Sequence, residues 1–294
     1  MFNKLFRIRR AACFPDLRLS ISPPPQPLRG SSSSLQRLIS TYGATMARVL
    51  GSFIAAVCLS VQAVSASPAH WSYRGDQGPD HWGELGDKLC STGQMQSPVN
   101  IDWREVTSRS VDSDALRVDY QVLPMEVLNN GHSIQAKPMG ETGLSYMGRH
   151  YRLMQFHFHT PSEHQFDQRE YPMEMHLVHQ ADDGGLLVLG VMIEQGEAND
   201  ELADLWDVLP EEEGGEARLG LLMAPQLQRL LPATGHHLFY DGSLTTPPCT
   251  EGVKWVLYEQ PIQLSASQIQ RFRELFPDNH RPARALDGRE VDED

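Results

Sequence analysis

The sequence predicts a mainly β domain with a few short peripheral helices over residues 67–294. Two patterns lead to this prediction: glycine and proline recur at short intervals, and the apolar runs between them are brief and rich in Val, Phe and Tyr. Such runs are typical of strands, whereas helices need longer segments with a period of 3.6 residues. No internal repeat or long linker divides this region, which is long enough for one domain with a sizeable core.

Several apolar runs have the length and composition of strands. They are Gln121 to Leu128, Tyr151 to His159, Met173 to His179, Leu186 to Ile193 and Val253 to Tyr258. Between the first run and Ser133-Ile134-Gln135 lies Asn129-Asn130-Gly131, a hairpin turn signal because asparagine and glycine tolerate a positive φ. We therefore expect the chain to reverse there into a neighbouring strand.

Helical periodicity is limited to three short segments, Asp200 to Val208, Ala224 to Leu231 and Ser265 to Leu275. The last segment begins with serine, a preferred N-cap residue, and carries Ile269 and Phe272 at helical spacing. These segments are too few and too short to form the main layer of the fold.

The first 66 residues are predicted to direct export. Residues 46–66 combine a basic start, an apolar run and small residues ending at Ala66, which is typical of a cleaved secretory signal peptide. Residues 1–45 form an upstream leader for which two interpretations remain: translation begins at Met46, or the Arg- and Ser-rich segment is an organelle transit peptide. Export predicts a periplasmic or secreted protein, with no stable membrane insertion because the apolar run spans a bilayer poorly.

Charge is distributed unevenly along the chain. The whole sequence has 25 basic and 38 acidic residues, and residues 1–66 hold 8 of the basic and 1 of the acidic ones. The remainder therefore carries a net charge near −20. A charge of this sign repels nucleic acids and anionic membranes, so neither is an expected partner.

The cysteine count agrees with export. Cys13 and Cys58 fall in the leader, which leaves Cys90 and Cys249 in the domain. An isolated pair in an exported chain indicates one disulfide, although two buried thiols are the alternative. On the chain-entropy model, closing a loop of this length would stabilise the fold by about 5 kcal/mol.

Two histidines alternate with aromatic residues in Gln155-Phe156-His157-Phe158-His159. Because successive side chains of a strand point to opposite faces, His157 and His159 share one face and the phenylalanines share the other. Two imidazoles on one face can chelate a metal. They can equally be a pair of hydrogen-bonded core histidines.

A second run, Glu174-Met175-His176-Leu177-Val178-His179, supports the metal hypothesis. Its period places Glu174, His176 and Val178 on one face and His179 on the other, so only one of these two histidines can join the first pair. Three imidazoles with an open fourth position are typical of catalytic zinc. An acid such as Glu174 beside a ligand can accept the other ring N–H and fix its tautomer.

These motifs together resemble those of the α-class carbonic anhydrases, of the exported bacterial type. The matching stretches are Tyr73-Arg74-Gly75, Pro79-Asp80-His81-Trp82, Gln96-Ser97-Pro98-Val99-Asn100-Ile101, Asn130-Gly131-His132, Gln155 to His159, Ser162-Glu163-His164, Glu174 to His179 and Gly242 to Cys249. They occur in one order over nearly the whole domain, which makes the combination specific. The resemblance implies a central, twisted, largely antiparallel sheet of about ten strands, with zinc in a conical cleft.

The resemblance implies zinc-dependent, reversible hydration of carbon dioxide to bicarbonate and a proton, through attack by zinc-bound hydroxide. It implies His157, His159 and His176 as the Zn²⁺ ligands. It implies three outer partners, Gln155 for His157, Glu174 for His176 and the backbone carbonyl of Asn279 for His159. Thr245 matches the gatekeeper, which accepts from the hydroxide and donates to Glu163; an ionised carboxylate can only accept.

The substrate and proton-path residues are also implied by the resemblance. The pocket for carbon dioxide matches Val178, Val188, Leu244, Trp255 and Thr246. His132 matches the proton shuttle, since an imidazole exchanges protons near neutral pH. Tyr73, Asn130 and Gln135 match polar residues that order the connecting waters. The other domain histidines, His70, His81, His150, His164, His179, His236, His237 and His280, are interpreted as structural or exposed.

The resemblance also implies that Cys90 and Cys249 form the disulfide of exported members, which would brace the loop of Thr245. Two other functions remain as alternatives: a non-catalytic carbonic-anhydrase-like binding module, and a zinc esterase. The binding module would lack one or more zinc histidines, whereas all three are present here. The resemblance leaves a homodimer open, and no interface can be read from the sequence.

Overall fold

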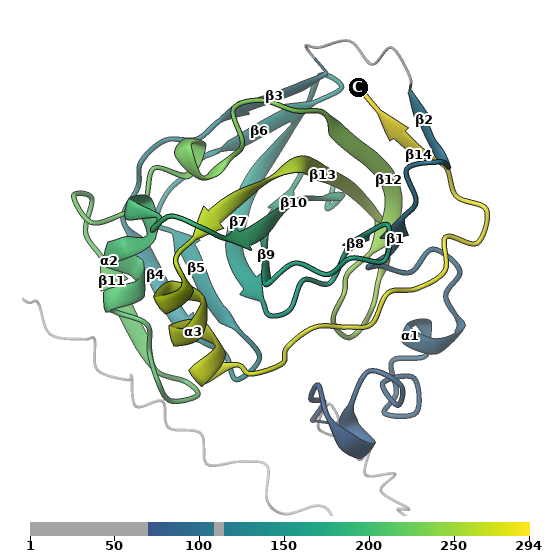
Figure 1. Ribbon diagram of the computed structural model, residues 1–294, viewed down its shortest axis with the longest axis horizontal. Helices are drawn as coiled ribbons and strands as arrows, with labels where there is room; N and C mark the ends of the chain where they lie inside the picture. The colour runs from purple at the N-terminus through teal and green to yellow at the C-terminus, as the bar shows by residue number, and fades with distance from the viewer. Residues whose placement is uncertain (1–69, 109–114) are drawn as a thin grey trace, which may run out of the picture. The chain divides into compact units, whose positions relative to one another are not determined.

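A twisted β-sheet dominates the computed structural model, which describes residues 70–108 and 115–294 (Figure 1). Within these ranges, one sheet contains 12 strands. Its main path runs in the order β11 (Glu216–Leu219), β4 (Met125–Asn129), β5 (Ile134–Pro138), β7 (Arg149–His159), β9 (Met173–Gln180), β10 (Leu186–Gln195), β13 (Glu251–Leu264), β12 (His237–Ser243), β14 (Val291–Glu293) and β2 (Val106–Ser108). The predicted mainly β fold is therefore confirmed, with a larger sheet than the ten strands expected.

Most neighbouring strands in this sheet are antiparallel. The exceptions within the described ranges are two parallel pairs, β10 with β13 and β14 with β2. Two strands lie off the main path, β3 (Leu116–Asp119) and β6 (Gly143–Tyr146). They pair with each other, and β6 also pairs with β7. A separate two-stranded sheet joins β1 (Asn100–Ile101) to β8 (Gln165–Phe166).

The helices are short, as the sequence predicts. They are α1 (Leu89–Thr92), α2 (Ala203–Asp207) and α3 (Ala266–Leu275), with 3₁₀ turns η1 (Gly75–Gln77), η2 (Asp200–Leu202) and η3 (Leu227–Leu230). Ser265 caps α3 in a capping box with Gln268, which confirms the predicted helix start. No helix in residues 70–108 or 115–294 is both long and apolar enough to cross a membrane.

Two sequence predictions need correction. The first predicted strand starts at Met125 rather than Gln121, because Pro124 has no N–H to donate to a ladder. The segment predicted as helical from Ala224 to Leu231 forms only the 3₁₀ turn η3. The leader at residues 1–45 and the signal peptide at 46–66 lie outside the described residues.

Alternation along the central strands divides the hydrophobic core between the two faces of the sheet. On β10, Leu187 and Leu189 join the larger cluster, whereas Val188 and Met192 join a second cluster. Helices α2 and α3 cover the first face, where Trp206 and Phe272 pack edge-on against Phe158. The opposite face of β7 and β9 is thereby left for polar side chains.

Candidate active site

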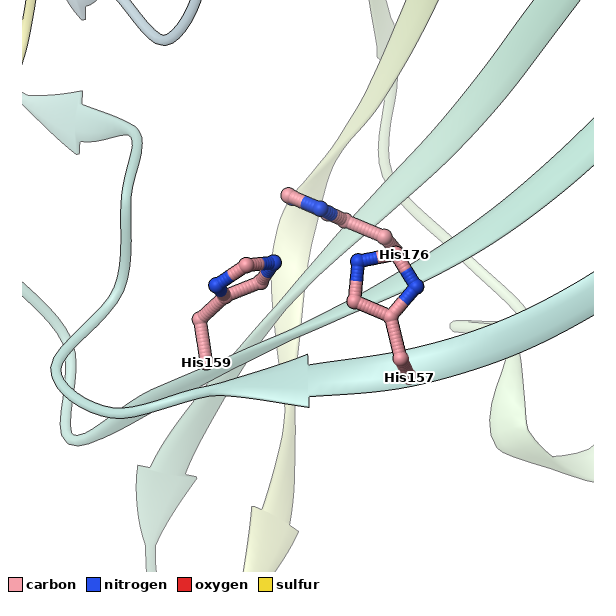
Figure 2. Close-up of side chains that lie close together, drawn as sticks. All are labelled: His157, His159 and His176. Carbon is pink, nitrogen blue, oxygen red and sulfur yellow. The ribbon is translucent and has the colours of Figure 1, made fainter. Parts of the chain in front are cut away.

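Three histidines from two neighbouring strands converge on one face of the sheet (Figure 2). His157 and His159 alternate with buried phenylalanines on β7, as predicted, and the antiparallel register places His176 of β9 directly opposite His157. The ring centroids are 4.9 Å apart for His157 and His159, 5.3 Å for His157 and His176, and 4.6 Å for His159 and His176. One nitrogen from each ring lies within 4.8 Å of the others.

The second nitrogen of each ring donates to a fixed acceptor. The pairs are His157 Nδ1 with Gln155 Oε1 at 2.8 Å, His159 Nδ1 with the Asn279 carbonyl oxygen at 2.7 Å, and His176 Nε2 with Glu174 Oε1 at 2.7 Å. Because these acceptors cannot donate, each neutral ring carries its lone pair on the other nitrogen. Those nitrogens are Nε2 of His157, Nε2 of His159 and Nδ1 of His176.

This donor set fits zinc. Nε2 of His159 is buried and has no hydrogen-bond partner among the described residues. Burial lowers the pKa of His159 to about 4, and burial together with neighbouring imidazoles lowers the pKa values of His157 and His176. The rings are therefore neutral at pH 7, as metal ligands must be. Three neutral imidazoles that leave a fourth position open are the usual catalytic zinc set.

The carboxylate of Glu174 is fully buried and receives four hydrogen bonds. Its Oε1 accepts from His176 Nε2 and from His164 Nδ1, each at 2.7 Å, and its Oε2 accepts from the backbone N–H groups of Glu163 and His164, each at 2.8 Å. Burial alone would raise the pKa of Glu174, but the two imidazoles outweigh it and hold the pKa well below its usual range. Glu174 is thus an ionised acceptor that fixes the tautomer of His176.

Glu163 lies between the histidine cluster and the segment that follows α3. Its Oε1 accepts from the Arg281 backbone N–H at 2.8 Å, and its Oε2 lies 3.4 Å from His159 Nε2 and 3.8 Å from His176 Nδ1. Burial raises the pKa of Glu163, although His176 and the neighbouring Thr245 side chain oppose the rise, and its buried Oε2 has no hydrogen-bond partner among the described residues. The structure therefore brings Thr245, which is 5% exposed, together with Glu163 and the cluster.

The apolar residues predicted for the substrate pocket form one row across three strands. Val188 of β10 pairs with Val178 of β9 on one side and with Trp255 of β13 on the other. Leu244 belongs to the same hydrophobic cluster. The Trp255 ring lies 4.9 Å from that of His176, which places this wall beside the histidines. Thr246 is partly exposed on the turn after β12.

His132 lies at the tip of the β4–β5 hairpin, where its ring stacks on Trp71 with centroids 3.6 Å apart. Burial and nearby His70 lower the pKa of His132, whereas Glu213 raises it. Tyr73 lies 6.4 Å from His132 between ring centroids. Asn130 is occupied by the turn itself, since its Oδ1 accepts from the backbone N–H groups of His132 and Ser133. Gln135 pairs directly with His157 in the sheet.

Comparison with known proteins identifies the family. A model of the eukaryotic-type carbonic anhydrases matches residues 77–293. The chain belongs to this family. Curated relatives and solved structures that resemble this chain are named carbonic anhydrases, so hydration of carbon dioxide is the activity that the fold and sequence support.

Bacterial carbonic anhydrases are similar over most of this chain. One from Klebsiella pneumoniae is 41% identical and the match covers 81% of this chain and 96% of that protein. One from Nostoc sp. is 38% identical, with coverage of 77% and 86%. The α-carbonic anhydrase from Thermovibrio ammonificans, solved with the inhibitor sulfanilamide, has a TM-score of 0.73 at 38% identity and covers 77% of this chain and 100% of its own.

In this carbonic anhydrase, Cys90 and Cys249 form the predicted disulfide. Both cysteines pack with Trp82 in a small buried cluster. The carbonyl of Cys90 accepts from the Arg281 guanidinium at 2.7 Å, and the N–H of Cys249 donates to the Thr246 carbonyl at 2.8 Å. The bridge therefore connects the turn after β12 with α1, and the hydrogen bond from Arg281 to Cys90 links α1 to the segment whose backbone N–H donates to Glu163.

Sequence reasoning missed two side chains that shape the carbonic anhydrase site. His164, interpreted as structural or exposed, is structural, but its link to the site was not foreseen: it is fully buried and connects Glu174 to Tyr240, with Nε2 2.6 Å from the Tyr240 hydroxyl. Its position next to Glu163 was the available signal. Trp71 covers His132, and no pattern in the sequence points to that contact.

Proposed function

We propose that this chain catalyses the zinc-dependent, reversible hydration of carbon dioxide to bicarbonate and a proton. The observation that carries the proposal is the convergence of three neutral imidazoles whose lone pairs face one another. Each ring is already oriented by a hydrogen bond on its far side. A zinc ion held by His157, His159 and His176 would supply a Lewis acid that lowers the pKa of a coordinated water to about 7, as is established for carbonic anhydrases.

Glu163 and Thr245 would orient the attacking oxygen. An ionised Glu163 accepts only, and its Oε1 is already occupied by the Arg281 N–H. The Thr245 hydroxyl would then donate its single hydrogen to Glu163, so its oxygen could only accept a hydrogen bond from the attacking group. A lone pair of that group is thereby directed away from Thr245 and toward the substrate.

Carbon dioxide would lie against the row formed by Val178, Val188 and Trp255. The substrate is small and has no hydrogen-bond donor, so a short apolar wall holds it without competing with water for polar contacts. Leu244 and Thr246 would complete the pocket from the turn after β12. A bulky ester finds less room against the same wall, which favours carbon dioxide as substrate over the esterase alternative.

His132 would carry the proton between the site and the solvent. Its lowered pKa leaves the imidazole neutral at pH 7, ready to accept a proton, and its half-buried position at a hairpin tip lets it pass that proton outward. Tyr73, Asn130 and Gln135 would order the waters that lead to it.

We propose a periplasmic or secreted location. The Cys90–Cys249 disulfide supports it, since disulfides persist in oxidising compartments. Residues 46–66, which have the pattern of a signal peptide, would direct export and be removed.

Stopped-flow hydration of carbon dioxide by the purified protein, before and after zinc removal with a chelator, tests the function. We expect fast hydration that is lost without zinc and restored by adding it. His157→Ala should abolish both zinc binding and hydration. Absence of hydration in protein with a full equivalent of zinc would contradict the proposal and favour the binding module.

A further inference from the structure

The ladder between β5 and β7 stops short of the shuttle candidate. The register pairs Ala136 with Phe156 and Gln135 with His157 and goes no further. His132 lies three residues beyond the last pair, at the tip of the β4–β5 hairpin. Other contacts must therefore hold the tip against β7.

Asn279, in the segment after α3, supplies such contacts. Its side-chain Nδ2 donates to the His132 carbonyl at 2.9 Å and to the Phe158 carbonyl at 3.0 Å, and its Oδ1 accepts from the Thr160 N–H at 2.7 Å. Because carbonyls accept and the N–H donates, only this orientation of the amide satisfies all three groups. The residue is 2% exposed, so these hydrogen bonds are shielded from water.

The backbone of Asn279 contacts the metal-ligand candidate next to these groups. Its carbonyl accepts from His159 Nδ1 at 2.7 Å, and its N–H donates to the Thr160 carbonyl at 3.1 Å. One buried residue thus contacts both the peptide of His132 and the ring of His159. No contact in the described part of the sheet links these two histidines so directly.

We infer that Asn279 is a positioning residue for proton transfer, because its side-chain amide fixes the His132 backbone relative to His159. The inference rests on the proposed shuttle role of His132. Both backbone polar groups of His132 are hydrogen-bonded to side chains. Its N–H donates to Asn130 Oδ1, and its carbonyl accepts from Asn279 Nδ2. Trp71 then restricts the ring. The imidazole of His132 can stay at a constant distance from the three clustered histidines only if the backbone of His132 is held in place as well as its ring.

A neighbouring contact provides the matched control. Ser133 Oγ also attaches the hairpin to β7, by donating to the Phe158 carbonyl at 2.6 Å. That carbonyl keeps its bond from Asn279 when Ser133 is changed, and so does the carbonyl of His132. Ser133→Ala should therefore cost stability without releasing the peptide of His132.

The experiment compares Asn279→Asp with Ser133→Ala in stopped-flow hydration at low buffer concentration. The aspartate side chain would keep an acceptor for Thr160, and the backbone carbonyl for His159 would remain, but the variant has no side-chain N–H for His132. Since misplacement by 1 Å can cost roughly 10²-fold, we expect kcat to fall about tenfold while kcat/KM changes by less than about twofold. Imidazole buffer should restore kcat, because it replaces the displaced shuttle.

Three further measurements separate positioning from folding. Zinc content should remain at one equivalent, and deuterium exchange should accelerate in residues 129–135. Asn279→Ser, which is too short to reach His132 and buries no charge, should give the same kcat loss if the aspartate variant fails to fold. Ser133→Ala should leave kcat unchanged.

A parallel fall of kcat and kcat/KM, an unchanged kcat in both Asn279 variants, or an equal kcat loss in Ser133→Ala would overturn the inference. His132→Ala distinguishes this failure from failure of the proposed shuttle. If His132→Ala lowers kcat and the Asn279 variants do not, only the positioning role is lost. If His132→Ala leaves kcat unchanged, the shuttle role and the inference are both wrong.

Discussion

The imidazole of His132 lies flat against the indole of Trp71, with 3.6 Å between ring centroids and 9° between ring planes. Trp71 comes from the first described residues of the chain, whereas His132 lies at the tip of a hairpin 61 positions later. The stack covers one face of the imidazole and contributes to the burial that lowers its pKa. The state of the shuttle candidate therefore depends on a residue far away in sequence.

Removing Trp71 should raise the pKa of His132. In Trp71→Ala the imidazole gains water on one face, and hydration favours the charged form. Glu213→Gln should shift the pKa the opposite way, because the Glu213 carboxylate favours the imidazolium. NMR titration of the His132 ring protons measures both shifts. Shifts of the same sign in the two variants would contradict this electrostatic account.

Glu174→Gln should weaken zinc binding about 10- to 100-fold, the range usual for loss of a partner of a metal-ligating histidine. Four hydrogen-bond donors now share the Glu174 carboxylate. The glutamine side chain would turn an NH₂ group, itself a donor, toward some of them. Competition with a chromophoric chelator measures the affinity. Glu170→Gln is the control, since exposed Glu170 accepts a hydrogen bond from the Gln165 side chain, away from the histidine cluster. Equal affinities in both variants would rule out the role of Glu174.

Reduction of the Cys90–Cys249 bridge should lower thermal stability before it lowers activity. Closing a 159-residue loop contributes about 5 kcal/mol on the chain-entropy model, and the histidine cluster itself contains no cysteine. Differential scanning calorimetry with and without reductant should show a clear drop in Tm. The double variant Cys90→Ala, Cys249→Ala should have a lower Tm than the unmodified protein, and the reductant should not change that Tm. Superimposable curves for the unmodified protein would contradict the prediction.

Acid should destabilise the fold partly through His179, which lies on the core side of β9. Burial lowers its pKa to about 3, while its Nε2 accepts from the Tyr120 hydroxyl at 2.7 Å. The unfolded chain protonates this group near pH 6.5 and the folded chain does not, so stability is full above that pH and declines as pH falls toward 3. One such group contributes about 1.4 kcal/mol per pH unit.

The matching variant is His179→Gln, which cannot be protonated. Urea unfolding at about pH 7.5, 6.0 and 4.5, from above the unfolded pKa into the window between the two pKa values, should give a shallower decline of the unfolding free energy than in the unmodified protein. Its stability at the highest pH should be lower, because the packing around Tyr120 changes. An identical slope would show that His179 is not a source of the acid sensitivity.

Strand alternation predicts which histidines share a face, and the family resemblance adds the choice of His176 as the third ligand. A period of two residues places His157 and His159 on one face, and it separates His176 from His179, which the structure also separates. The capping serine of α3 was predictable for a similar reason, because its contact is local. The family resemblance added the breadth of the sheet and the order of the motifs.

Long-range contacts could not be predicted from local patterns. His164 reaches Tyr240 across 76 positions, and its importance depends on a hydroxyl whose place is set by β12. The parallel pairing of β10 with β13 likewise depends on the whole sheet. The apolar pattern predicts a strand from Gln121, but the strand begins at Met125, since Pro124 has no N–H to donate to a ladder. These features depend on the three-dimensional fold and cannot be predicted from the periodicity of the sequence.

The bond between Cys90 and Cys249 closes residues 90–249 into a covalent ring. The three clustered imidazoles, Glu163 and Thr245 all belong to this ring. A protease that cuts once within it, for instance at the exposed turn of Gly214, leaves a single molecule whose two pieces stay linked. Such a nicked protein should migrate as one species on a gel until a reductant separates the fragments.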